Sequence, residues 1–323
     1  MKSLAVLPLI LGAVSLAMAC GSATERIIFD DRVDGGGTTG DGGGGDKDGG
    51  GGFEFDGNLP DSAVKDECSK MDVVFVVDDS ASMAGAQTKL KANFPRMVDT
   101  LNAFKTKSGG QLDYRLAVTS TDTDLATGTR PQRAFDQGSR GGFLTKPTTA
   151  CDPGAGGRVW LERTDPNVAN AFGCRAGMGT AGSSIEKPID GLVLSLTDRL
   201  GDQNKNFVRE DALLAFVILT DEEDSSTSTG IAAIQKLDLL KKARGRWAGA
   251  VISGQKAGSC TTPGHSAVQA PKLHQLVDNA ADPATGKNNV IWRTICQENF
   301  DTAVKDALDT FTVACLNIPP LPK

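Results

Sequence analysis

Aromatic residues and histidine are scarce in this 323-residue sequence, and several common site patterns are missing from it. Aromatic residues make up 5% of the chain, so the core of a folded domain must consist mainly of Val, Leu, Ile and Ala. Only two histidines are present, which argues against a His-rich metal site. The seven cysteines form no CxxC pair, so zinc sites of that type have no support. The net charge is −6 and no basic cluster with interleaved aromatics occurs, so we expect no nucleic-acid partner.

Residues 1–19 have the pattern of an export signal peptide. One basic residue precedes an apolar run that is too short for a spanning helix, and small residues lead to Cys20. Two cleavage sites remain open. The tripeptide AMA suits ordinary signal peptidase, whereas the next cysteine resembles a bacterial lipobox in which Leu16 stands one position from the usual place. Removing Cys20 leaves six cysteines that can all pair in an exported protein. We therefore expect a lipid anchor on Cys20 and attachment to a bacterial outer membrane, on its periplasmic or outer face.

Residues 20–64 are expected to be a flexible linker. The stretch 34–52 is almost entirely glycine and aspartate, so it has too little to bury to offset its own ordering entropy. Calcium-binding nonapeptide repeats are also rich in these residues. They need an apolar residue at a fixed position in each repeat, and none is present here. We expect one folded domain, 65–323, on a tether that reaches roughly 35 Å.

Apolar runs alternate with amphipathic helical patterns along the expected domain, apart from a Cys-containing excursion at about 120–178. This alternation predicts an α/β fold, a doubly wound, mostly parallel sheet flanked by helices. Such sheets bind ligands at the carboxyl ends of their strands, where the strand order changes direction. The expected strands are 72–77, 114–118, an edge strand at 158–161, 213–219, 247–252 and 290–295, and the expected helices are 87–104, 186–200, 231–243, 268–281 and 300–311.

Oxygen-bearing side chains follow two of the expected strands. Asp78, Ser80 and Ser82 come directly after the run DVVFVV, and Asp221 comes after LLAFVILT. One interpretation is a helix N-cap, because Asp and Ser often satisfy free N–H groups there. The other is a cation site, and its oxygen donors would suit Mg²⁺, Ca²⁺ or Mn²⁺ rather than zinc or copper.

The order of these motifs resembles the von Willebrand factor A family, over nearly all of the chain after residue 70. The family's metal-ion-dependent adhesion site combines Asp-x-Ser-x-Ser after the first strand, a Thr in a glycine-containing loop, and an Asp after the fourth strand. The resemblance implies a cation, Mg²⁺ first and Ca²⁺ or Mn²⁺ as alternatives, that holds an acidic side chain of a protein partner. Ser183 and Ser184 lie close to Thr180, which matches the family pattern because it follows a glycine. The ligands implied are Asp78, Ser80, Ser82, Thr180 and Asp221.

The acidic run 221–224 departs from the family, whose members often have Asp-Gly at this place. Extra carboxylates should retain a cation more strongly and repel an acidic ligand at short range. Glu222 and Asp224 are additional candidate ligands, which could build a second Ca²⁺ site. In the alternative interpretation, Glu222 and Glu223 only complement the N-terminus of the helix that begins near Ile231.

Six cysteines are expected to pair by their proximity in the fold, although six allow 15 arrangements. The first pair would tie the ends of the domain together, the second would close the excursion, and the third would link two late loops. The chain is also similar in its organisation to lipoproteins predicted in myxobacteria and related bacteria. The shared features are a lipobox, a Gly/Asp linker, a cysteine-containing domain of this type and the end IPPLPK. The expected pairs are Cys68 with Cys315, Cys151 with Cys174, and Cys260 with Cys296.

Enzyme signatures are incomplete, so we expect a binding protein and no enzyme. The sequence GHSAV at 264–268 resembles a nucleophile elbow but lacks its final glycine. The SxxK spacings at 184–187 and 253–256 lack the motifs that accompany them in acylating enzymes. His265 and His274 are expected at the surface or partly buried. The alternative to metal-dependent adhesion is a structural or assembly component of the cell envelope; a hydrolase is less well supported.

Overall fold

The computed structural model describes residues 68–123, 140–144, 151, 157–298 and 300–322. The chain divides into two units, 1–57 and 58–323, and all described residues belong to the second. The expected signal peptide, the anchor at Cys20 and the whole expected linker therefore lie outside the described residues, as does part of the excursion. Within the described ranges, no helix is both long and apolar enough to cross a bilayer.

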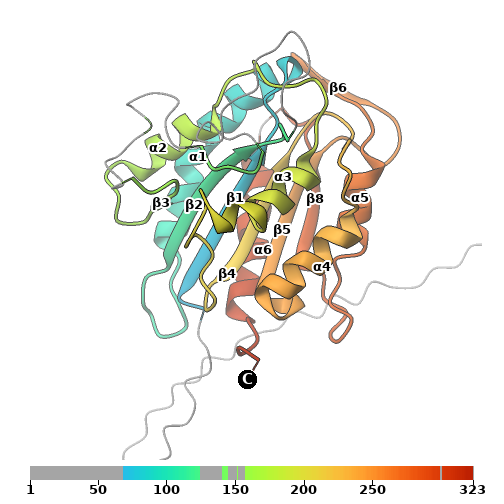
Figure 1. The fold of residues 1–323 in the computed structure, drawn as a ribbon. Helices are drawn as coiled ribbons and strands as arrows, with labels where there is room; N and C mark the ends of the chain where they lie inside the picture. Colours follow the sequence, from blue (N-terminus) through green and yellow to red (C-terminus); the bar gives the residue numbers. More distant parts are fainter. Residues whose placement is uncertain (1–67, 124–139, 145–150, 152–156, 299, 323) are drawn as a thin grey trace, which may run out of the picture. The chain divides into compact units, whose positions relative to one another are not determined.

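A six-stranded sheet forms the centre of the described unit, in the order β3-β2-β1-β4-β5-β8 (Figure 1). Its neighbouring strands are parallel, except that β3 runs antiparallel to β2. This sheet confirms the predicted doubly wound, mostly parallel α/β fold. β4 is an unbroken apolar run because both of its faces are buried. The strands are β1 (Lys70–Val77), β2 (Asp113–Ser120), β3 (Leu161–Glu162), β4 (Leu213–Leu219), β5 (Trp247–Ser253) and β8 (Val290–Thr294).

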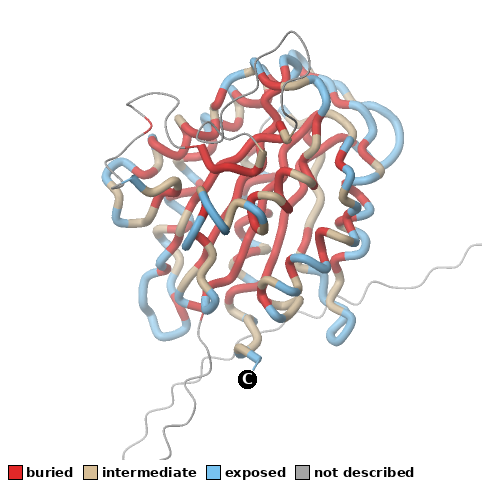
Figure 2. The backbone as a smooth tube through the Cα atoms, in the orientation of Figure 1, coloured by how far each residue is buried: buried red, intermediate tan, exposed pale blue. Residues whose placement is uncertain are grey.

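Helices cover both faces of the sheet and create two separate apolar cores. Successive residues of β1 alternate between them, with Phe75 in one core and Val76 in the other. Figure 2 shows the buried residues running along the central strands, between the two helical layers. One face carries α1 (Ala84–Ala103), α2 (Val168–Ala176) and α6 (Asp301–Leu316), and the other carries α3 (Pro188–Ser195), α4 (Gly230–Lys241) and α5 (Pro271–Asp278).

Some elements differ from the expectation. Helix α2 lies inside the excursion, and a hairpin of β6 (Cys260–Thr262) and β7 (His265–Ala267) lies after β5; neither is predicted from the sequence. The hairpin takes up residues that precede α5, so that helix begins only at Pro271. α3 likewise begins at its proline, which leaves Glu186 in the preceding loop.

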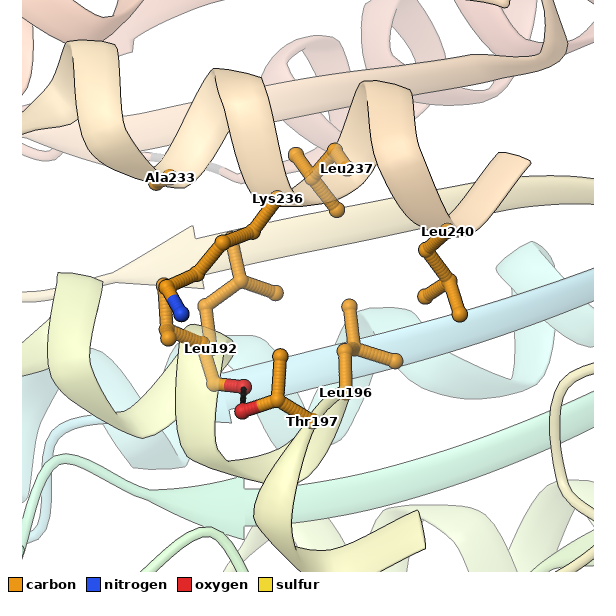
Figure 3. A pocket seen from close by; sticks show the side chains of 8 residues that line it. Leu192, Leu196, Thr197, Ala233, Lys236, Leu237 and Leu240 are labelled. Atoms are coloured by element: carbon orange, nitrogen blue, oxygen red, sulfur yellow. Dashed lines mark hydrogen bonds between the residues drawn. The ribbon is translucent and has the colours of Figure 1, made fainter. Parts of the chain in front are cut away.

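Helices α3 and α4 leave a small apolar pocket between them (Figure 3). Leucine side chains from α3, its C-terminal cap and α4 face one another across the pocket, among them Leu192, Leu196 and Leu237. Its volume is about 10 Å³, which is the space of a single water molecule. The pocket is therefore a gap in helix packing rather than a ligand site.

Three disulfides close the described unit, and they are the three pairs that the sequence analysis predicts. Cys68 lies just before β1 and Cys315 lies in the last turn of α6, so the disulfide between them ties the two ends of the unit together. The others join the excursion to α2 and the β6–β7 hairpin to the loop after β8. The bridges are Cys68–Cys315, Cys151–Cys174 and Cys260–Cys296.

Candidate cation site

Strands β1 and β4 end side by side where the strand order changes direction. β2 lies on one side of β1 and β4 on the other, which is the arrangement that opens a ligand site in doubly wound sheets. Val77 pairs with Leu219, and the Asp78 N–H donates to the Leu219 carbonyl at 2.9 Å. The loops that carry Asp78 and Asp221 are therefore neighbours at the carboxyl edge of the sheet.

Asp78 is fully buried and holds both loops in place. One carboxylate oxygen accepts the Ser80 N–H at 2.8 Å, and the other accepts the Thr220 hydroxyl at 2.7 Å. Burial raises the pKa of Asp78, while these hydrogen bonds act in the opposite direction. The carboxylate thus joins the end of β1 to the end of β4.

The hydroxyls of Ser80 and Ser82 do not act as helix caps. Ser80 stands at the N-cap of η1 (Ala81–Met83), yet its side chain makes no capping hydrogen bond. The two Oγ atoms lie 2.9 Å apart, and Ser82 Oγ donates to Asp221 Oδ1 at 3.0 Å. Oxygens from the two loops therefore form one connected chain, which the N-cap interpretation does not explain.

Thr180 is not joined to this chain of oxygens by any hydrogen bond between described residues, and it is half-buried. Its loop is nevertheless close to the end of β1. The Gln87 side chain donates to the carbonyls of Asp78 and Gly179, at 2.9 and 2.8 Å. The Gly182 N–H donates to the Asp79 carbonyl at 2.8 Å. The structure thus connects Asp78, Ser80, Ser82 and Asp221, and places the Thr180 loop beside them.

Glu186 belongs to the site but was missed in the sequence motifs. Its side chain is fully buried; the Thr121 hydroxyl donates to Oε2, while Oε1 has no hydrogen-bond partner among the described residues. Burial raises the pKa of Glu186 to about 10, and the charges of Asp78 and Asp79 act in the same direction. The only signal in the sequence was an acidic residue two positions before a helix-starting proline, and it is a weak one.

Asp221 faces His265 of the β6–β7 hairpin. Asp221 Oδ2 lies 3.9 Å from His265 Nδ1 and has no hydrogen-bond partner in the part of the chain that the structure describes. Burial, followed by the charge of Asp78, raises the pKa of Asp221 to about 7. Burial, followed by the charge of Lys89, lowers the pKa of His265. His265 and His274 are both buried, at 7% and 8% exposed, so the expectation that they lie at the surface or are partly buried is wrong. Ser266 lies in the middle of β7 and not at a turn between a strand and a helix, so the geometry of a nucleophile elbow is not found here.

The additional acidic candidates play different parts. Asp224 is buried at the start of α3, where Oδ1 accepts the Ile189 N–H at 3.3 Å and the Ser226 hydroxyl at 2.5 Å. Burial raises the pKa of Asp224 to about 6. Burial and the charge of Asp78 also raise the pKa of Glu222. Asp224 therefore stabilises the N-terminus of α3, whereas the negative charge of Asp78 acts on Glu222.

The sequence suggested that this acidic run complements the N-terminus of the helix near Ile231. That interpretation names the wrong helix. Thr229 caps α4, because its hydroxyl accepts the Ala232 N–H at 3.1 Å. Glu223 accepts the Lys272 N–H at 3.3 Å instead, in the first turn of α5. The acidic run thus serves the N-termini of α3 and α5.

The donor set fits a hard divalent cation. The connected donors are all oxygens, and two buried carboxylate oxygens, Asp221 Oδ2 and Glu186 Oε1, have no hydrogen-bond partner among the described residues. Burial and the neighbouring Asp78 raise the pKa values of Glu186 and Asp221, so ionising both carboxyls is unfavourable without a cation, and a bound cation would favour their ionised forms. No group of three or more His, Cys, Asp or Glu residues in the described ranges could hold a metal ion, so a cation here would depend on the serine hydroxyls.

No family model and no curated protein matches this chain. Among solved structures, it is similar to proximal thread matrix protein 1 from the mussel byssus, at 15% identity and a TM-score of 0.38, with 78% of this chain and 48% of that chain covered. A further structure of that protein is described as having a zinc-occupied MIDAS motif. The chain is also similar to the manganese-loaded TRAP protein of Plasmodium vivax, at 13% identity and a TM-score of 0.38, with 77% and 75% covered. It therefore spans about half the length of the byssus protein.

Proposed function

We propose that the folded unit binds a divalent cation where β1 and β4 end, and that the bound cation holds an acidic side chain of a protein partner. The observation that carries this proposal is the connected chain of Ser80, Ser82 and Asp221 oxygens at the edge where ligands bind such sheets. Oxygen donors alone favour Mg²⁺, with Ca²⁺ or Mn²⁺ as alternatives. The chain would thus be a metal-dependent binding or adhesion protein and no enzyme.

Each residue of the site would have a different role in binding the cation. Ser80 and Ser82 would offer their hydroxyls as direct ligands, and Asp221 would supply charge directly or through water. Asp78 positions Ser80 through the Ser80 N–H. The cation, when bound, supplies an electrophilic position for a carboxylate. Glu186, whose raised pKa keeps it protonated in the cation-free protein, would ionise more readily beside a bound cation and would then help to retain it.

We further propose that a lipid anchor at Cys20 attaches the protein to a bacterial outer membrane. The sequence supports this through its signal-like residues 1–19 and through the even number of cysteines that remain once Cys20 is lipidated. Metabolic labelling with a radioactive fatty acid tests it in the native host. Label should enter the unmodified chain and be absent from Cys20→Ser; equal labelling of both would contradict the anchor.

A structural or assembly role without a metal is the second candidate. Two observations favour it. Both carboxylate oxygens of Asp78 already accept hydrogen bonds within the protein, and no hydrogen bond among the described residues joins Thr180 to the other proposed ligands. Under this alternative the serine chain is a loop-stabilising network, and partner binding is insensitive to chelators.

Calorimetric titration of Mg²⁺, Ca²⁺ and Mn²⁺ into the metal-stripped chain tests the proposal. We expect saturable binding, and a loss of affinity of about tenfold or more in Ser82→Ala and Asp221→Asn, because each removes a proposed oxygen ligand. Ser184→Ala is the matched control, since this exposed hydroxyl lies in the neighbouring loop outside the chain of oxygens. Circular dichroism should show all variants folded. If the unmodified chain binds none of the three ions, the metal-dependent proposal fails and the structural role becomes the favoured one.

A further inference from the structure

The His265 imidazole is buried against the candidate cation site, and its side chain is 1% exposed. The Ser82 backbone is a hydrogen-bonding neighbour of the ring, but neither ring nitrogen has a partner of normal hydrogen-bond geometry among the described residues. Nδ1 faces Asp221 Oδ2 at 3.9 Å, and this oxygen also lacks a partner there. Burying unpaired polar groups is unfavourable, so two such groups that face each other indicate a shared ligand between them.

The hairpin that carries His265 is held firmly against the site. The disulfide Cys260–Cys296 ties it to the loop after β8, and the Val268 N–H donates to the Asp221 carbonyl at 3.0 Å. The Gly264 carbonyl packs so closely on the start of α1 that a Cβ on Gly85 would lie 2.7 Å from its oxygen. The hairpin is therefore fixed by long-range contacts, which hold the imidazole beside Asp221.

We infer that His265 is a nitrogen ligand of this cation site, which would then prefer ions that accept imidazole, Zn²⁺ above all, over Mg²⁺. This inference rests on the proposed function. Zinc lies about 2.0–2.2 Å from imidazole nitrogen and carboxylate oxygen, so a tetrahedral ion holds two such atoms about 3.4 Å apart. Asp221 Oδ2 and His265 Nδ1 are 3.9 Å apart, so they would have to approach by about half an ångström on binding the ion.

The imidazole changes the metal preference expected from the oxygens. A site of hydroxyls and carboxylates alone suits Mg²⁺ and Ca²⁺, whereas imidazole together with carboxylate suits Zn²⁺ and other transition ions. The absence of a His-rich pattern in the sequence therefore does not exclude a histidine ligand, because a single histidine from a distant hairpin completes the set.

Calorimetric titration of Zn²⁺ and Mg²⁺ into the metal-stripped chain, prepared without a histidine tag, tests this inference. We expect Zn²⁺ to bind at least about tenfold more tightly than Mg²⁺. His265→Gln should lower the Zn²⁺ affinity at least about tenfold and change the Mg²⁺ affinity less than about threefold, because only the nitrogen ligand is lost. His274→Gln is the matched control: it is similarly buried, but its Nε2 lies 3.3 Å from the Gly254 carbonyl and its ring packs on Trp292.

A second measurement needs no variant. Pulsed electron paramagnetic resonance of the Mn²⁺-loaded unmodified chain should detect coupling to an imidazole nitrogen. Absence of that coupling, or an unchanged Zn²⁺ affinity in His265→Gln, overturns the inference. If Ser82→Ala and Asp221→Asn still lose Mg²⁺ binding, the proposed function stands without it. If the unmodified chain binds no ion at all, the proposed function fails first.

Discussion

At the scale of single residues, the buried carboxyls at the two ends of β1 have different charged neighbours. Asp72, at the start of the strand, is buried and paired with Arg209, whose Nε donates to Oδ1 at 2.8 Å and whose backbone N–H donates to Oδ2 at 2.6 Å. Burial raises the pKa of Asp72 and also those of Glu186 and Asp221, but Arg209 opposes the shift at Asp72, whereas negative neighbours add to it at the other two. The protein thus supplies a positive partner at the start of the strand, and at its end we propose that a cation does so.

Glu186→Gln should stabilise the cation-free protein at neutral and alkaline pH. The folded-state pKa of about 10 lies above the ordinary value of about 4.3, so ionisation favours the unfolded state. The unmodified protein should lose stability as the pH rises between these two values, and the variant should lose less. We expect a gain of roughly 1–3 kcal/mol at pH 8, the usual cost of a poorly satisfied buried polar group.

Urea unfolding in a chelator at pH 5 and pH 8 measures this difference. Glu210→Gln is the control, because Glu210 is exposed and hydrogen-bonded to Lys242, which lowers its pKa. It should leave the pH dependence nearly unchanged. Equal stability of Glu186→Gln and the unmodified chain at both pH values would contradict the prediction.

At the scale of elements, the loop before α3 packs directly on the loop after β1. A Cβ on Gly182 would lie 2.3 Å from the carboxylate carbon of Asp79, so a larger residue here would force the buried Asp79 side chain to move. The contact places the loop that carries Thr180 and Glu186 against the candidate ligands. The packing of two loops therefore decides the shape of the site.

Gly182→Ala should lower the affinity for the cation by several-fold without removing any proposed ligand. Overpacking of this kind costs about 1–3 kcal/mol, and here the strain falls on Asp79, beside Asp78 and Ser80. Gly201→Ala is the matched control, since a Cβ there meets no atom within 4 Å. Calorimetric titration of Mg²⁺ compares them, and equal affinities would show that the loop contact does not shape the site.

At the scale of the whole molecule, the disulfides close chain segments of very different length. Cys68–Cys315 spans 247 residues and Cys260–Cys296 spans 36. In the chain-entropy model, the longer bridge removes more freedom from the unfolded chain, about 5.5 against about 4 kcal/mol. The longer bridge ties the ends of the folded unit together, and the shorter one holds the hairpin of His265.

Paired serine variants separate these two effects. Cys68→Ser with Cys315→Ser should lower the free energy of unfolding more than Cys260→Ser with Cys296→Ser does, by roughly 1–2 kcal/mol. Urea unfolding of both variants measures this order. A larger loss from the shorter bridge would show that its effect on the native hairpin outweighs chain entropy.

Much of the fold was predictable because its signals are local. The run LLAFVIL predicts β4 with the bounds that the structure has, since a strand buried on both faces is apolar throughout. The alternation of strands and helices predicts the doubly wound sheet. Helix ends were less predictable, because Pro188 and Pro271 each begin a helix later than the apolar pattern does.

The sequence by itself determined the sheet, the exit of Asp78, Ser80 and Ser82 from β1, and the place of Asp221 after β4, because strand ends and motif spacing are properties of neighbouring residues. Only the tertiary structure decided that Glu186 and His265 join them. A loop packed on Asp79 carries Glu186, and a disulfide-tied hairpin carries His265. Neither contact leaves a periodic pattern in the chain, since each joins residues that are far apart in sequence and close only after folding.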